Sequence, residues 1–243
     1  MTAHPGVSAG NIGTIFRREI RSYFNSPVAY VVIVVFLAII GWFFTSSLFL
    51  MNVASLRTMF ELVPWVFLFF VPAITMRLLA EEKKSGTLEL LTTKPVHDAE
   101  IVIGKFLAAW ALLAAALLPT LLYLVTIMFL GSVDIGPVIT GYLGLLLMGA
   151  VYIGIGLFAS SITENQIVAF IVSFLIILAL FMLDKILMYV PEGIVSTVEF
   201  LGIDYHYSNI ARGVIDSRNI IYFGSLLGFS LLLATVSLER RKW

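Results

Sequence analysis

Six long apolar runs divide the chain, and each is long enough to cross a lipid bilayer as a helix. Spanning the hydrocarbon takes about 20 consecutive apolar residues. The runs predict transmembrane helices at approximately 28–50, 60–79, 101–130, 137–160, 166–190 and 219–238. Pro64 and Pro72 lie inside the second run, so we expect that helix to be bent or broken. The pattern predicts an all-α integral membrane protein.

A shorter segment before the first run has two unlike faces. Between residues 12 and 25, apolar side chains recur at helical spacing, and Arg17, Arg18 and Arg21 fall between them. A helix of this kind lies in the membrane interface with its arginines toward anionic headgroups. We therefore expect an N-terminal amphipathic helix that contacts membrane lipid.

The segment 191–218, between the fifth and sixth runs, is too short to form a domain of its own. Its apolar residues predict short helices that dip back into the membrane, which is a re-entrant arrangement. The chain thus divides into a cytoplasmic N-terminal region, 1–27, and a transmembrane domain, 28–243.

Composition agrees with a membrane protein and sets its orientation. The chain is 60% hydrophobic and only 12% charged, with a mean hydropathy of +1.03; soluble domains are about 25% charged. Six spans place both termini on one side, and eleven of the fifteen Lys and Arg residues fall there against four on the other side. The positive-inside rule therefore puts the termini and the loop 81–100 in the cytoplasm. A net charge of zero gives no basis for binding nucleic acid.

The sequence lacks the motifs of several catalytic classes. Gly104-Lys105 is not part of a Walker A loop, because Phe106 follows it and Ala99 stands where the first glycine would be. The three histidines are far apart, and there is no cysteine, which excludes paired histidine ligands, cysteine catalysis and cysteine-bound zinc. We expect no catalytic residue, no metal site and no cofactor bound by this chain.

Ionisable residues near the runs stand at their ends. Glu61 and the pair Asp184-Lys185 are candidates for contacts along a transport pathway or with a second subunit. The alternatives are that Glu61 is only the polar start of the second span, and that Asp184-Lys185 reaches the outer interface or marks an early end of the fifth span. The span centres are apolar, which weakens an ion-coupled mechanism.

Small residues indicate close packing of two spans. Gly149, Gly154 and Gly156 give the fourth span a face for close approach, and Gly224 and Gly228 form a G-x-x-x-G motif in the sixth. These motifs predict packing against some partner and nothing more specific.

Charge is concentrated in one segment, since eight of the thirty charged residues fall between positions 81 and 100. We expect Glu81 to Lys84 to prolong the second span into water and Ser85-Gly86 to break that helix. Residues 87–92 then predict a short helix with a leucine face, ended by Lys94-Pro95. Because those leucines have nothing of their own chain to pack against, the segment is suited to docking a partner; the alternative is a solvated connecting loop.

This segment, EEKKSGTLELLTTKPVHDAEIVIGKF, closely resembles the one that follows span two in ABC-2 type transporter permeases. There an acidic residue, a Gly-Thr, a Glu-Leu-Leu, a Pro and a Gly-Lys recur with this spacing. In this sequence they are Glu81 or Glu82, Gly86, Thr87, Glu89, Leu90, Leu91, Pro95, Gly104 and Lys105. The stretches FNSPVAYVV, IGLFASSITENQIVAF and NIARGVIDSRNIIYF are similar to the permease of the gliding-motility-associated subgroup.

The resemblance implies an ABC-2, type V exporter-like, transmembrane domain in the bacterial inner membrane. It implies that a separate ATPase dimer binds ATP and Mg, that residues 87–94 form the coupling helix, and that the amphipathic helix is the connecting helix. A second permease, either another copy or a related chain with a periplasmic domain, completes the complex. Gliding itself does not follow from it.

Two other functions remain open at this stage. A stand-alone secondary transporter or channel predicts an ionisable relay deep in the membrane and needs no cytoplasmic docking helix. An ABC relative that performs mechanical work on periplasmic proteins uses the same cytoplasmic residues as an exporter. The sequence does not identify a substrate.

Overall fold

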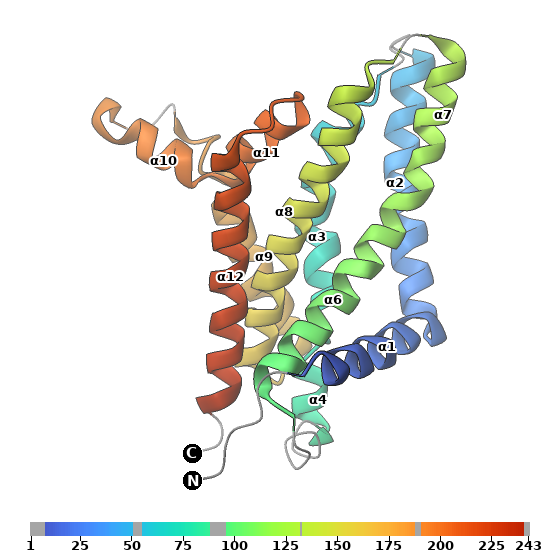
Figure 1. Ribbon diagram of the computed structural model, residues 1–243. Helices are drawn as coiled ribbons and strands as arrows, with labels where there is room; N and C mark the ends of the chain where they lie inside the picture. The colour runs from blue at the N-terminus through green and yellow to red at the C-terminus, as the bar shows by residue number, and fades with distance from the viewer. Residues whose placement is uncertain (1–7, 51–54, 88–95, 132, 188–190, 241–243) are drawn as a thin grey trace.

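The computed structural model describes residues 8–50, 55–87, 96–131, 133–187 and 191–240, and every regular element within these ranges is a helix (Figure 1). The longer helices are α1 (Ala9–Asn25), α2 (Pro27–Leu50), α3 (Arg57–Thr75), α6 (Asp98–Leu117), α8 (Ile135–Ile162), α9 (Gln166–Met182) and α12 (Ser217–Glu239). The shorter ones are α4 (Ala80–Lys84), η1 (Leu118–Thr120), α7 (Leu121–Leu130), η3 (Glu192–Ile194), α10 (Val195–Leu201) and α11 (Ile203–Ala211).

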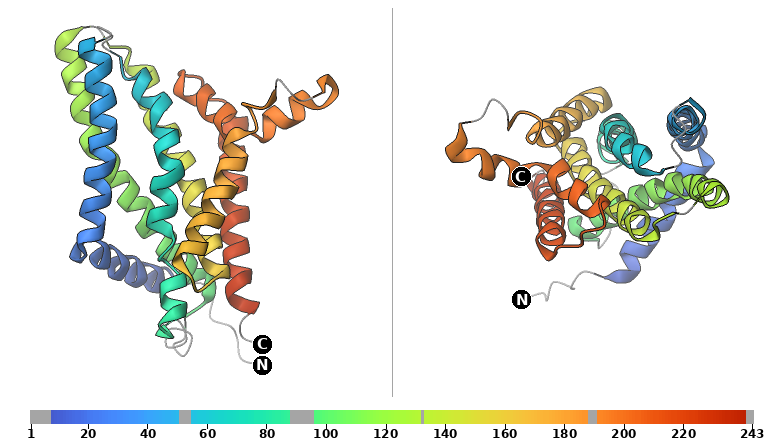
Figure 2. Two further views of the ribbon diagram at one scale, coloured as in Figure 1. Left: turned by 180° about the vertical axis from the view of Figure 1, so that it is seen from behind. Right: turned by 90° about the horizontal axis from the view of Figure 1, so that it is seen from above.

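The long helices form an elongated bundle. Within the described residues, five stretches are long and apolar enough to cross a membrane: α2, α3 with α4, α6 with α7, α8, and α12. The apolar helix α9 has 17 residues and packs beside α8. Helix α1 lies across one end of the bundle, where α4 and the last turn of α12 also lie (Figures 1 and 2). We call this the α1 end, and the opposite one the α11 end.

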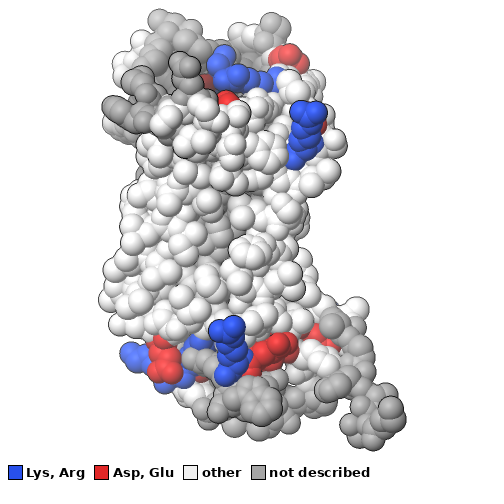
Figure 3. Space-filling view, turned by 90° about the vertical axis from the view of Figure 1, so that its left-hand side faces the viewer, with Lys and Arg blue, Asp and Glu red and all other residues white. Residues whose placement is uncertain are grey.

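Charged side chains mark these two ends. In Figure 3 the Lys, Arg, Asp and Glu residues gather in two bands, and the visible belt between them is uncharged. This distribution is the one expected of a multi-pass membrane protein, because a charge in the hydrocarbon is costly. It also agrees with the prediction that the span centres are apolar.

Helix α8 is the centre of the bundle. It packs against α3, α6, α9, α11 and α12. Of its most apolar stretch of 18 residues, 78% is buried, compared with 22% for the corresponding stretch of α2. Glycines make this possible, since a Cβ on Gly149 would meet Leu113 of α6 and one on Gly154 would meet Ser230 of α12. The predicted close-approach face is confirmed. By contrast, a Cβ on Gly224 or Gly228 of α12 would meet nothing within 4 Å beyond its own helix in the described part of the chain.

A Cβ at Gly156 should be costly, because it would overlap the side chain of Thr75 on α3 and lie 2.7 Å from its Cβ. We expect Gly156→Ala to lower the free energy of unfolding by about 1–3 kcal/mol, which is typical of overpacking. Gly224→Ala is the matched control and should cost nothing by this mechanism. Thermal unfolding of both variants in one detergent measures the difference, and equal melting temperatures would contradict the packing at Gly156.

Two predicted spans differ from the observed helices. The fifth was expected to reach residue 190, but α9 ends at Met182 because Asp184 and Lys185 form a polar turn tied to Asp204. The third begins at Asp98 and is interrupted by η1, which contains Pro119. The other spans agree with the helices to within about four residues at each end.

The predicted break in the second span is confirmed. Helix α3 ends at Thr75 and α4 begins at Ala80, so the backbone between them loses part of its helical hydrogen bonding. The hydroxyl of Ser160 on α8 fills the gap: it accepts bonds from the N–H groups of Leu79 at 3.0 Å and Ala80 at 2.9 Å and donates to the Met76 carbonyl at 3.0 Å. Irregular backbone inside a bundle needs such partners, since lipid offers none.

Candidate functional site

A buried lysine joins three elements at the α1 end. The side chain of Lys105, at the start of α6, is 2% exposed, and its Nζ lies 3.2 Å from Glu19 Oε1 on α1 and 2.9 Å from Glu82 Oε1 on α4. Arg18 also contacts Glu82, at 3.0 Å. A cation at this depth requires paired carboxylates. We call Arg18, Glu19, Glu82 and Lys105 the ion-pair network.

Gly104 explains why α1 can approach so closely. A Cβ at this position would meet Ile15 of α1 at 2.7 Å. Next to it, the buried carboxylate of Glu100 accepts hydrogen bonds from the Ser8 N–H, from Asn11 Nδ2 at 2.9 Å and from the His97 N–H at 3.0 Å. The start of α1 is therefore fixed to the start of α6 by a carboxylate, and its middle by a close helix contact.

The three arginines of α1 have different surroundings. All three are exposed. Arg18, whose side chain is 54% exposed, differs from Arg17 and Arg21 because it turns toward Glu82. On the other face, Tyr23 packs against the core and burial raises its pKa. The amphipathic pattern thus has an apolar face turned to the bundle and two arginines facing away from the ion-pair network.

The charged segment that follows α3 begins as predicted. Arg77 and Glu81 form an ion pair at 2.8 Å, and α4 ends at Lys84 before Gly86, whose φ of +70° is the left-handed conformation that favours glycine. A cavity of about 250 Å³ lies between α1, α2, α3, α4 and α6, and Thr87 is among the residues that line it. Glu89, Leu90, Leu91 and Pro95 lie outside the described residues.

The remaining candidates come together at the α11 end. Glu61 is exposed and pairs with Arg57 at 3.0 Å, while Lys185 contacts Asp184 at 3.0 Å and also Asp204 of α11. These five charged residues all line one cavity of about 860 Å³. Helix α9 ends at Met182, as the alternative of an early end to the fifth span predicts, and whether Asp184 and Lys185 contact a transport pathway stays a prediction.

The sequence analysis did not single out three residues of these sites. Glu19 stands on the apolar face of α1, one helical turn from Ile15 and from Tyr23, where an acidic residue could have indicated a buried cationic partner. Glu100 occupies the third position after His97, the spacing of a capping box. Asp204 pairs with Lys185 across 19 positions, and no local pattern predicts that contact.

Among the described residues, no group of three or more His, Cys, Asp or Glu side chains is arranged to hold a metal ion. Both sites consist of ion pairs and hydrogen bonds that hold helices together or line a cavity. Their arrangement suits mechanical linkage at the α1 end and ligand contact at the α11 end.

Comparison with known proteins identifies one family. A family model described as "ABC-2 family transporter protein" matches residues 55–238, from the loop before α3 to the last turn of α12. The match includes Glu82 and Lys105 of the ion-pair network and the whole lining of the larger cavity. None of the curated proteins matches the chain.

Proposed function

The chain belongs to the ABC-2 transporter family, and we propose that it is a permease subunit driven by a separate ATPase subunit. The ATPase dimer would bind ATP and Mg, and this chain would carry no catalytic residue. Hydrolysis would be coupled to export or to mechanical work across the membrane.

The ion-pair network is the observation that supports this proposal most directly. It joins α1 to α4 and α6, which are the helices on either side of residues 88–95. If a partner pushes on that segment, the displacement reaches α1 and the start of α6 together, because Lys105 is bonded to both neighbours. Residues 87–94 would be the coupling helix and α1 the connecting helix.

We propose the following membrane arrangement. Helix α9 is the fifth of six spans, since its 17 residues reach the lower limit for crossing the hydrocarbon. The α1 end faces the cytoplasm with both termini, as the positive-inside rule predicts. Helix α1 lies in the interface of the bacterial inner membrane, with Arg17 and Arg21 available to anionic lipid or to the ATPase.

The complex would contain two permeases, as a homodimer or with a related chain that has a periplasmic domain. Affinity purification of this subunit from its native membrane in mild detergent, followed by mass spectrometry, tests the composition. Recovery of a Walker A protein, with or without a second permease, supports the proposal. The identity of that partner then tests the assignment to the gliding-motility-associated subgroup. Recovery of the chain alone, where known ABC complexes survive, favours a stand-alone carrier.

Reversing one charge in the proposed coupling helix should weaken docking. We expect Glu89→Arg to reduce the recovered ATPase by about tenfold, since like charges at an interface disfavour association. Glu239→Arg, which makes the same change on the exposed last turn of α12 at the same end, is the control. Equal recovery of the ATPase by both variants would contradict the assignment of the coupling helix.

A further inference from the structure

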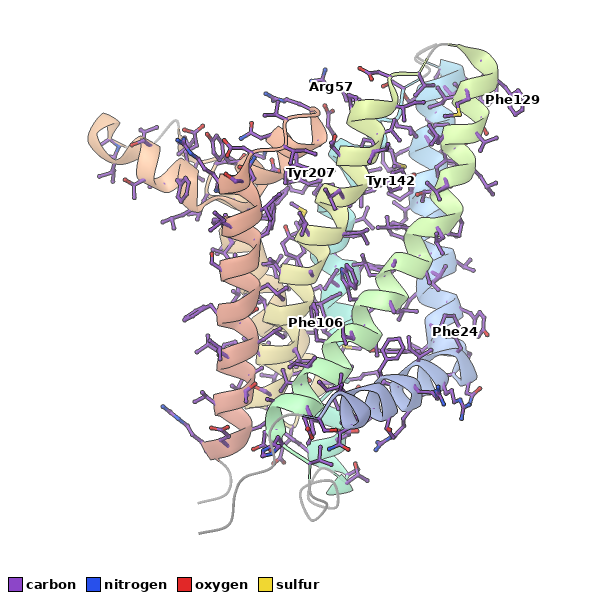
Figure 4. All side chains as sticks on the ribbon, viewed as in Figure 1. Phe24, Arg57, Phe106, Phe129, Tyr142 and Tyr207 are labelled. Carbon is purple, nitrogen blue, oxygen red and sulfur yellow. The ribbon has the colours of Figure 1, made fainter. Side chains whose placement is uncertain are left out.

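The larger cavity, at the α11 end, has the dimensions of a ligand site. Its volume of about 860 Å³ falls in the range of pockets for small molecules, and its walls come from α3, α7, α8, α11 and the turn after α9. Figure 4 shows Tyr207 extending from α11 into the bundle at this end, near Arg57. The Tyr207 hydroxyl donates to the Phe60 carbonyl at 2.7 Å and so fixes α11 to α3.

The charges inside the cavity do not balance. Four carboxylates line it, from Glu61, Asp134, Asp184 and Asp204, against three cationic side chains. Glu61 is neutralised by Arg57 in its own ion pair. Asp184 and Asp204 have to share Lys185, and their side chains are only 16% and 15% exposed.

One atom in this group lacks a hydrogen-bond donor. Asp184 Oδ1 is buried and has no partner within the described residues. Burial raises the pKa of Asp204, and the contact with Lys185 offsets this only in part. Both observations indicate that two carboxylates with one lysine are short of one positive charge.

An apolar surface lies in the same cavity. Trp65 of α3 lines it and is 45% exposed, with its ring held edge-on against Phe181 at a centroid distance of 4.8 Å. Phe60 and Ile127 also line the cavity. An exposed indole face attracts both apolar groups and cations.

We propose that this cavity binds an amphipathic molecule carrying a protonated amine, with the ammonium group at Asp184 and Asp204 and the apolar part against Trp65. The ammonium donates a hydrogen bond to Asp184 Oδ1 and supplies the missing positive charge. A hydrogen bond between an ammonium and a carboxylate is stronger than one between neutral groups. That the bound amine is the transported cargo rests on the proposed function, whereas the binding itself requires no ATPase.

Binding of 2-phenylethylammonium to the full-length chain in phosphatidylcholine nanodiscs, measured by calorimetry against empty nanodiscs, tests this inference. We expect the amine to bind at least about tenfold more tightly than 2-phenylethanol or 3-phenylpropionate, which differ mainly in charge. Equal affinities for the three compounds would overturn the proposal. Tighter binding of the carboxylate would overturn it too, because the cavity would then select anions through Arg212.

Variants locate the site. Asp184→Asn should weaken binding of the amine by about tenfold, while Glu199→Gln on α10, which is also at the α11 end but does not line the cavity, should leave it unchanged. If both variants bind the amine equally, the assignment to Asp184 is wrong. Should Asp184→Asn fail to fold, the comparison of the three compounds on the unmodified chain still decides. Failure of the ATPase to co-purify would contradict the proposed function and leave this result standing.

Discussion

Replacing Lys105 with methionine should lower the free energy of unfolding by about 3–5 kcal/mol, the cost of removing one member of a buried ion pair. Methionine fills a similar volume, so the loss comes from charge. Glu19 and Glu82, each 13% exposed, would lose the buried cation between them and keep only Arg18, whose side chain is 54% exposed. Thermal unfolding of the purified subunit measures the effect.

Two further variants separate charge from packing. Lys84→Met removes an exposed lysine on α4 and should change stability by less than about 0.5 kcal/mol. Adding Glu19→Gln and Glu82→Gln to Lys105→Met should recover part of the loss, because no carboxylate is then left unpaired. If Lys105→Met is no less stable than Lys84→Met, the ion-pair network does not hold these helices.

The same reasoning suggests why a membrane protein retains buried charges at this position. A buried ion pair contributes little net stability compared with apolar residues of similar volume. It does fix one relative position of its helices, since Lys105 loses a bond if either α1 or α4 moves alone. Such a linkage is useful where a displacement has to pass from one element to the next.

Length and hydropathy were enough to predict most of the bundle. A span needs about 20 apolar residues, so the approximate positions of five candidate spans could be predicted from the runs alone. The early end of α9 at Asp184-Lys185 was only one of the alternatives, because the choice depends on a tertiary contact between Lys185 and Asp204 of α11. The sequence also did not distinguish the glycines of α8 from those of α12, because Gly156 and Gly224 differ only in which side chains of other helices lie next to them.

For the site, the sequence identified residues but not their partners. Glu82, Gly104 and Lys105 belong to the quoted motif. The motif does not include Glu19, which pairs with the buried Lys105 and lies 86 positions earlier. Helical periodicity places Glu19 on the apolar side of α1, between Ile15 and Tyr23, but gives no indication of which cation faces it. The network depends on how α1 lies across α6, and that geometry is set by Gly104 and Ile15 in contact.

Replacing Ser160 with alanine should be nearly as costly as losing Lys105. The substitution removes one oxygen but leaves three backbone groups at the break between α3 and α4 without their bond: the N–H groups of Leu79 and Ala80 and the carbonyl of Met76. A buried polar group that loses its partner costs about 1–3 kcal/mol. We therefore expect a loss of about 3–4 kcal/mol in the free energy of unfolding, measured by thermal unfolding in the same detergent.

Ser173 on α9 provides the matched control. It is also a buried serine in an apolar helix, but its hydroxyl donates only to the Phe170 carbonyl of its own helix, at 2.9 Å. Because that carbonyl belongs to a regular helix, Ser173→Ala should cost less than about 1 kcal/mol. Hydrogen exchange of Leu79 and Ala80 adds a local measurement: both amides should exchange faster in Ser160→Ala and not in Ser173→Ala. Unchanged exchange at the two amides would mean that water or another group can replace the hydroxyl, and that α8 does not hold the break in place.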